Sequence, residues 1–251
     1  MTLGVLAAGC GSPKSGAGAP PAAAAPAGAW PQGRAAPVRI TDDLTLSIPL
    51  AYLRSALSGE AAAPGAPGSP PHGEVRFEFF LPGFTGYTPE NYRRESDENR
   101  VEVVYLHAGN PHEAEPDAPG EYPPNMLKRL LTDAFDPRHY SDRHGLRCYQ
   151  ARSMQGRIAC YGRRDAQHGE DILLTALTPP YPADAGFPVF QARYFSKRYG
   201  GVRLEWRAHM SQLPRWHEID AQIWKFIGEW RLAPAAPAAG PAAPARAKAG
   251  G

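Results

Sequence analysis

The chain has 251 residues, with 27 Lys and Arg against 25 Asp and Glu, so its formal net charge is +2. Hydrophobic residues make up 43% of it, an ordinary share for a soluble globular protein. We find no basic run and no basic stripe interleaved with aromatic residues, which argues against nucleic acid as a partner. No segment of the sequence is long and apolar enough to predict a transmembrane helix.

A cysteine follows a run of small residues near the start of the chain. Residues 6–10 read Leu-Ala-Ala-Gly-Cys, which resembles the lipobox of bacterial lipoproteins. In that family the signal peptide is cut before the cysteine, whose thiol takes a diacylglycerol. The resemblance implies that Cys10 is a lipidated N-terminus in the periplasm, on the inner or the outer membrane. No Lys or Arg precedes Cys10 and the apolar stretch is short, so we expect the true start codon upstream.

Three stretches consist almost entirely of Ala, Pro, Gly and Ser, namely 11–36, 61–71 and 233–251. Such stretches have too little apolar side-chain mass to offset the entropy lost on ordering, so disorder is expected. The predicted organisation is a signal-peptide remnant at 1–9, a lipidated tether at 10–36, a single domain at 37–233 with a disordered insert at about 60–73, and a disordered tail at 234–251. A domain of that length can bury an interior without a metal.

The first half of the domain is expected to contain three strands and a helix. Alternation of apolar and polar residues predicts strands at Val38–Pro49, Val75–Leu81 and Arg100–His107. A short helical turn is expected at Leu50–Leu57. Apolar residues recur at spacings of three and four over Asn125–Phe135, which predicts an amphipathic helix.

Two cysteines lie in short β-like runs, Leu146–Gln150 and Gly156–Tyr161, that flank a predicted turn around Met154. Pairing about that turn places Cys148 opposite Cys160, within reach of a disulfide. An oxidising periplasm allows the bond. The alternative is a pair of buried free thiols. The spacing is not a zinc pattern, so we predict no metal here.

The second half continues with a strand at Asp171–Leu177 and a predicted hairpin of Val189–Phe195 and Val202–Arg207. A C-terminal amphipathic helix follows, with Pro214 expected in its first turn. Its apolar stripe is expected to pack on the sheet and consists of Trp216, Ile219, Ile223, Ile227 and Trp230. Strands linked by hairpins, with helices apart from them, predict an α+β fold built on antiparallel sheet, with one internal helix and the C-terminal helix.

A long loop is predicted at Gly83–Asp97, and its segment Gly83–Arg94 is the candidate protein-binding segment. Exposed aromatic and Arg side chains dominate interface energetics, and functional residues concentrate on loops. The candidate residues are Phe84, Tyr87, Tyr92, Arg93 and Arg94. The alternative is an irregular loop packed on its own aromatic side chains.

Four residues of metal-ligand type fall within nine positions: Asp136, His139, Asp142 and His144. Interleaved arginines at 138 and 143 would repel a cation, so a solvated loop is the favoured interpretation and no metal or cofactor is predicted. We find no nucleophile elbow, phosphate-binding Gly-rich loop or His-Glu-x-x-His motif, so no catalytic residue is predicted. Glu74, Glu78 and Glu102 are best explained as charges on the outward faces of strands. A periplasmic enzyme is therefore the least favoured of the candidate functions.

The segments 194–207 and 213–220 are similar to uncharacterised proteobacterial lipoproteins, some of which are immunity proteins of type VI secretion systems. The resemblance implies a non-enzymatic, periplasmic protein-binding module that blocks the active site of an effector toxin. The alternative is a structural or accessory envelope lipoprotein of a secretion or assembly machine. The expected partner is therefore an effector or an envelope component.

Overall fold

The computed structural model describes residues 33–58, 73–92, 97–110, 112, 115, 123–154, 156–165, 167–177 and 188–233. Cys10 and most of the predicted tether lie outside these residues, as do most of the predicted insert and the predicted tail. The first strand begins at Ala35, inside the range predicted for the tether.

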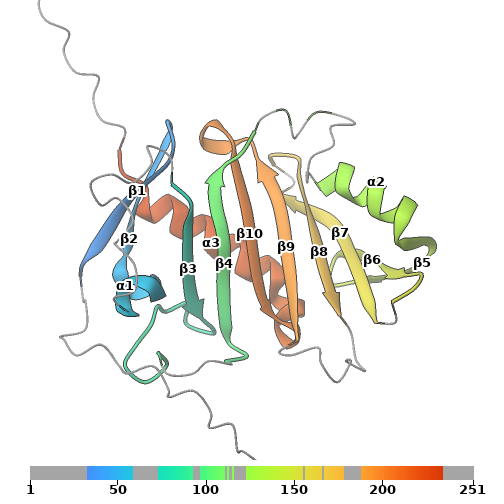
Figure 1. Cartoon of the computed structure of the whole chain (residues 1–251), viewed down its shortest axis with the longest axis horizontal. Helices are drawn as coiled ribbons and strands as arrows, with labels where there is room; N and C mark the ends of the chain where they lie inside the picture. The colour runs from blue at the N-terminus through green and yellow to red at the C-terminus, as the bar shows by residue number, and fades with distance from the viewer. Residues whose placement is uncertain are drawn as a thin grey trace, which may run out of the picture.

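An eight-stranded antiparallel sheet dominates the fold, with the strand order β3-β4-β10-β9-β8-β7-β6-β5 (Figure 1). Its strands are β3 (Val75–Phe80), β4 (Arg100–Ala108), β5 (Phe135–Arg143), β6 (Leu146–Ala151), β7 (Arg157–Asp165), β8 (Glu170–Leu177), β9 (Val189–Ser196) and β10 (Val202–His209). From β5 to β10 each strand pairs with the next one along the chain. β4 and β10 then join the two halves of the domain in the middle of the sheet.

A separate hairpin precedes the sheet, where the sequence predicted one strand. β1 (Ala35–Thr41) pairs with β2 (Leu44–Pro49), and the chain turns between them at two aspartates. The predicted helical turn is confirmed as η1 (Leu50–Tyr52) followed by α1 (Arg54–Ser58). The hairpin is tied to the end of the C-terminal helix, since the amide of Leu232 donates to the carbonyl of Thr45 at 2.8 Å.

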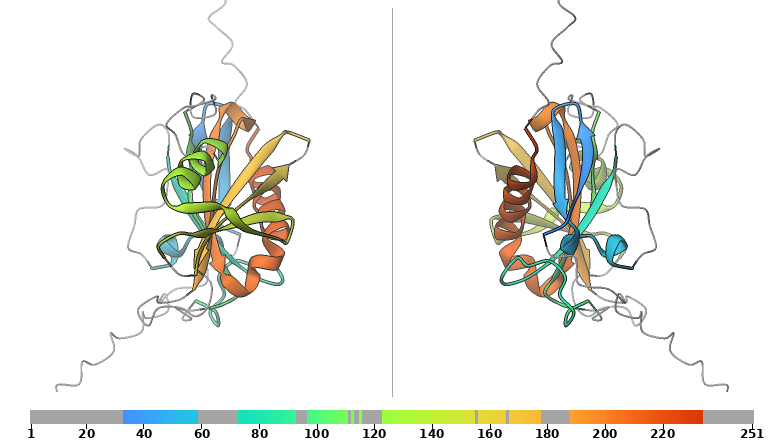
Figure 2. Two further views of the ribbon diagram at one scale, coloured as in Figure 1. Left: turned by 90° about the vertical axis from the view of Figure 1, so that its right-hand side faces the viewer. Right: turned by 90° about the vertical axis from the view of Figure 1, so that its left-hand side faces the viewer.

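The two longer helices lie on opposite faces of the large sheet (Figure 2). α2 (Pro123–Asp133) packs on one face, over β7 and β8. α3 (Trp216–Trp230) crosses the other face. The predicted α+β class is therefore confirmed. The predicted position of Pro214 is wrong, because it lies in the 3-10 segment η4 (Met210–Arg215) before the helix. A shorter 3-10 turn, η3 (Arg198–Gly200), joins β9 to β10.

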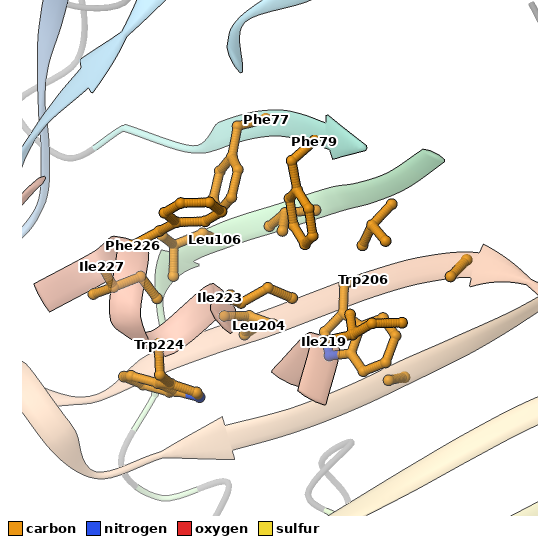
Figure 3. Packing of buried hydrophobic residues seen from close by; sticks show 14 of the residues in the cluster. Phe77, Phe79, Leu106, Leu204, Trp206, Ile219, Ile223, Trp224, Phe226 and Ile227 are labelled. Carbon is orange, nitrogen blue, oxygen red and sulfur yellow. The ribbon is translucent and has the colours of Figure 1, made fainter. Parts of the chain in front are cut away.

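The main core lies between α3 and the sheet (Figure 3). Helix residues at spacings of three and four meet the inward side chains of β3, β4, β9 and β10, as the apolar stripe predicts. Figure 3 shows Trp206 of β10 beside Ile219, and the ring of Phe226 lies 5.4 Å from that of Phe79 on β3. Both Trp206 and Ile219 have an exposed fraction of 0%. Burial on this scale accounts for most of the favourable free energy of folding.

The interpretation of residues 136–144 as a solvated loop is wrong, because they form most of edge strand β5. Tyr140 pairs with Tyr149, and Arg143 pairs with Leu146 across a two-residue turn. Both turn residues, His144 and Gly145, have positive φ, 53° and 75°, which is the backbone of the tight hairpin turns that match strand twist. β5 shows no apolar alternation because most of its side chains are exposed.

The predicted disulfide is confirmed. Cys148 on β6 lies directly opposite Cys160 on β7, and the two sulfurs are bonded. Both residues are buried in the main core, on the same side of the sheet as α3. The bond therefore fastens the edge hairpin of β5 and β6 to β7, the third strand from that edge.

Replacing both cysteines with alanine is expected to lower the free energy of unfolding by about 2–4 kcal/mol. The reason is that the bond restricts the unfolded chain by closing a loop between residues 12 apart in sequence. Urea unfolding of the oxidised protein and the double variant measures the difference. Unfolding the natural chain in the presence of a reductant is the control and should match the variant. Equal stability of the oxidised protein and the double variant would contradict this account.

Candidate functional site

The tyrosines of the predicted binding loop are buried, so their expected exposure is wrong. Tyr87 and Tyr92 have exposed fractions of 3% and 4% and pack with Phe80 and Leu57 in a small separate cluster. Phe84 is half-buried against the main core. These three residues follow the alternative interpretation, a loop packed on its own aromatic side chains. Arg93 and Arg94 lie outside the described residues, and the role of the loop in binding stays a prediction.

A largely buried carboxylate, with its side chain 13% exposed, contacts this loop. Glu78 accepts a hydrogen bond from the hydroxyl of Tyr87, and the Nε of Arg100 lies 3.6 Å from it. Burial raises the pKa of Glu78, although the Tyr87 hydrogen bond and the Arg100 charge act in the opposite direction. Burial also raises the pKa of Tyr87. The pair joins the loop to β3, a structural role that its sequence pattern did not reveal.

Replacing Glu78 with glutamine is expected to make the protein more stable, relative to the natural chain, as pH rises. The pKa of the folded-state carboxyl is raised above its ordinary value of 4.5, so the folded state binds more protons than the unfolded state above that pH. The natural chain therefore loses stability as pH rises through this window, and the glutamine variant does not lose that contribution. Urea unfolding from pH 4 to 7 measures it, with the exposed Glu74→Gln as control. If the free energy of unfolding of the Glu78 variant instead fell further below that of the natural chain as pH rose, the raised pKa assigned to Glu78 would be contradicted.

A buried ionic network joins α3 to the sheet. Arg164 of β7, with a side chain only 3% exposed, pairs with Glu170 of β8 and with Asp220 of α3. Its Nη1 donates to Asp220 at 3.0 Å. The guanidinium also lies 4.6 Å from the ring centroid of Tyr194 and 5.0 Å from that of Trp224. Both rings add cation-π attraction in a desolvated site.

Asp220 is the acceptor at the centre of this network. It accepts hydrogen bonds from the hydroxyl of Tyr194 at 2.5 Å and from the indole of Trp206 at 3.3 Å, in addition to Arg164. Burial raises the pKa of Asp220, and the Arg164 charge opposes that shift. Since these groups are buried and bonded to one another, we assign the network to holding α3 in place and to no chemistry.

The four residues of metal-ligand type are spread along β5 and its turn. The carboxylate of Asp136 lies 3.5 Å from the ring of His139, and Asp142 pairs with Arg147 at 3.0 Å. Among the described residues, no group of three or more His, Cys, Asp or Glu side chains is arranged to hold a metal ion.

An exposed aromatic and basic surface lies on the side of β5 and β6 that faces away from α3. We call it the β5–β6 face and define it by Tyr140, Asp142, Arg147 and Tyr149. Tyr140 is 50% exposed, and its ring lies 6.0 Å from that of Tyr149. The guanidinium of Arg147 stacks 4.6 Å from the centroid of Tyr140 while its Nε donates to Asp142. Tyr and Arg are the residue types enriched where binding energy concentrates.

An open pocket of about 560 Å³ borders this face. Its lining comes from α2, β5, β6, β7 and the β5–β6 turn, and three of the four residues of the β5–β6 face contribute to it. The lining consists of Leu127, Asp142, Gly145, Leu146, Arg147, Tyr149 and Tyr161. Polar and apolar atoms contribute about equally to this lining, so the pocket can receive an apolar side chain beside charged groups. This site was not predicted from the sequence, although Tyr140 and Tyr149 flank the His144-Gly145 turn symmetrically.

Comparisons with known proteins give one informative result. No protein-family model and no characterised protein sequence matches the chain. The fold is similar to the solved structure of an immunity protein of the Stenotrophomonas maltophilia type IV secretion system. The TM-score is 0.52 at 11% sequence identity, and the match covers 80% of this chain and 94% of that one. No described helix has the length and apolar character to cross a membrane. The chain therefore shares its fold with a secretion-system immunity protein, at low sequence identity.

Proposed function

We propose that this chain is an immunity-type protein that neutralises a secreted effector by binding it. The observation that carries the proposal is the fold likeness, which extends over 94% of the Stenotrophomonas immunity protein. The exposed Tyr and Arg side chains of the β5–β6 face supply a surface of the composition that protein interfaces use. That neighbour belongs to a type IV system, so the expected type VI assignment has no support from the fold. The proposal therefore names only a secreted effector.

The proposal is tested with the protein encoded by the gene next to this one. Producing that protein in the periplasm of a host is expected to stop growth, and co-producing this chain is expected to restore it. Titration calorimetry should then show a one-to-one complex. A neighbour that forms a complex without being toxic, as a component of a secretion machine would, favours the accessory lipoprotein and contradicts the immunity role.

We also propose that the protein acts in the periplasm from a lipid anchor on Cys10. With the natural upstream sequence present, the protein is expected in the membrane fraction, and Cys10→Ala is expected in the soluble periplasmic fraction. Loss of the diacylglycerol removes the apolar contacts that hold the chain on the bilayer. Fractionation and intact mass measure the effect, with Ser12→Ala as the neighbouring control. A natural chain that is already soluble and unmodified would contradict the anchor.

A further inference from the structure

We propose that the β5–β6 face is the surface that binds the effector, and that it recognises an acidic loop of that partner. In this complex a large apolar side chain of the loop enters the pocket beside Tyr149, and neighbouring Asp or Glu side chains pair with Arg147 and the arginines around it. The inference rests on the proposed function and assigns it a surface and a partner chemistry.

Charge is distributed unevenly along the chain, and the β5–β6 face lies within a basic segment. Residues 123–164 carry nine Lys and Arg against three Asp, whereas the whole chain is nearly balanced at 27 against 25. Eight of the nine are exposed, the exception being the buried Arg164. They are Lys128, Arg129, Arg138, Arg143, Arg147, Arg152, Arg157 and Arg163. They are spread over α2 and β5–β7 and do not all lie on one face, but an excess of positive charge in this part of the fold favours encounter with an acidic partner.

The central arginine is held in position before any partner arrives. Arg147 is stacked on Tyr140 and donates its Nε to Asp142, two contacts that fix the plane of its guanidinium. A guanidinium has five N–H donors in a rigid fork, and the contact to Asp142 uses one of them. A preorganised fork binds a carboxylate in a bidentate manner at a lower entropic cost than a flexible Lys.

Side chains, and not an added strand, are the expected means of binding. β5 is the last strand of the sheet, and strand addition would need a row of open backbone donors along it. Pro137 supplies no N–H group, and the pairing of β5 with β6 is irregular between Phe135 and Tyr140. Exposed charges flank the regular part of the strand at Arg138 and Arg143. These features block edge pairing and leave the face of the hairpin as the binding surface.

An acidic protein fits these observations better than an anionic membrane. A lipid surface would be attracted by the basic charge alone. It would gain nothing from a pocket with apolar walls at Leu127 and Tyr161. Binding to an anionic membrane is therefore treated as an alternative result of the experiment below.

The test reverses the charge of Arg147 on the β5–β6 face and, as a control, that of Arg39, an equally exposed arginine elsewhere that also pairs with an aspartate. Arg147 is 50% exposed and pairs with Asp142, while Arg39 on β1 is 51% exposed and pairs with Asp42. Binding of the full chain to the protein encoded by the adjacent gene is measured by calorimetry at low and high salt. Arg147→Glu is expected to weaken binding at least about 30-fold, the level of an interface hot spot. Arg39→Glu is expected to change it less than about threefold, since the two surfaces are separate.

Two further measurements keep the outcomes distinct. The natural complex should weaken as salt rises, and Arg147→Glu should show a smaller salt dependence. Urea unfolding of both variants should stay close to that of the natural chain, because both positions are exposed. A neighbour-encoded protein that binds equally well to Arg147→Glu overturns this inference and leaves the proposed function standing. A neighbour-encoded protein that does not bind the natural chain overturns both.

The same variants are mixed with vesicles of phosphatidylethanolamine and phosphatidylglycerol, using the Cys10→Ala background to remove any lipid. No co-sedimentation above that of Arg147→Glu is the expected result. Strong vesicle binding that Arg147→Glu abolishes, together with unchanged binding to the neighbour-encoded protein, would identify an anionic membrane as the occupant and overturn the acidic-protein assignment.

Discussion

Replacing Arg164 with methionine is expected to lower the free energy of unfolding by about 3–5 kcal/mol near pH 8, the loss typical when one partner of a buried ion pair is removed. Methionine keeps much of the apolar volume but leaves Glu170 and Asp220 without their cation, in a site where both side chains are nearly buried. The loss should be smaller near pH 5. Burial already raises the pKa of Asp220, and the Arg164 charge that opposes this shift is then gone, so the folded variant binds a proton that the unfolded chain does not and acid favours folding.

Chemical denaturation at several pH values measures this effect. Arg163→Met is the matched control, because Arg163 is adjacent to Arg164 on β7 but its side chain is 54% exposed, and its partner Asp171 keeps the hydrogen bond from the hydroxyl of Tyr161. Its loss should be below about 1 kcal/mol. Arg164→Lys should give an intermediate loss, since one ammonium replaces a fork that reaches two carboxylates with different nitrogens. A loss that is the same at pH 5 and pH 8 would contradict the assignment of the network.

Trp206→Ala is expected to lower the free energy of unfolding by about 3–5 kcal/mol, the cost of emptying a large aromatic site in a packed core. Trp206 is fully buried, stacks edge to face with Phe190 at 5.5 Å between ring centroids, and lies against α3 (Figure 3). The indole also donates to Asp220, so its removal takes one hydrogen bond from a buried carboxylate. Urea unfolding followed by circular dichroism measures the loss.

Trp206→Phe separates the two contributions to that loss. Phenylalanine fills most of the cavity but has no N–H group, so its loss reports the hydrogen bond to Asp220 together with a small packing defect. We expect a loss of about 1–2 kcal/mol, within the range for one hydrogen bond to a charged group. If the phenylalanine and alanine variants lost equal stability, the hydrogen bond and not the ring volume would be the main contribution of this residue.

The local pattern of apolar and polar residues was sufficient to predict most strands of the large sheet and the disulfide. Val202–His209 alternates apolar and polar residues because one face of the strand packs on α3 while the other faces away. The position of the bond followed from a hairpin register that two short runs and a turn define. β5 was missed because it is an edge strand whose side chains are mostly exposed, so its pairing with β6 leaves no trace in hydrophobic periodicity.

The buried tyrosines and the ionic network depend on contacts that are distant in the sequence. Tyr87 is buried because Leu57 and Phe80 reach it from other elements, which the composition of its own loop does not indicate. Arg164 and Asp220 lie 56 positions apart, so no local spacing relates them. The β5–β6 face had a local signal in the symmetric placement of Tyr140 and Tyr149 about a Gly turn. That signal is visible only if residues 140–149 are interpreted as a hairpin. The Asp and His residues at 136–144 were interpreted as a solvated loop instead, so the hairpin was not predicted.

The pairing of β4 with β10 has a consequence for how the chain acquires its structure. Leu106 lies opposite Leu204, so β4 pairs with a strand that is synthesised nearly one hundred residues later. β3 and β4 therefore have no complete sheet to join, and no α3 to cover them, until the end of the domain has left the ribosome. Non-local pairing of this kind slows folding, because a long loop must close before the contacts that stabilise it can form. The β5–β8 meander, joined by short turns, is the part able to form first.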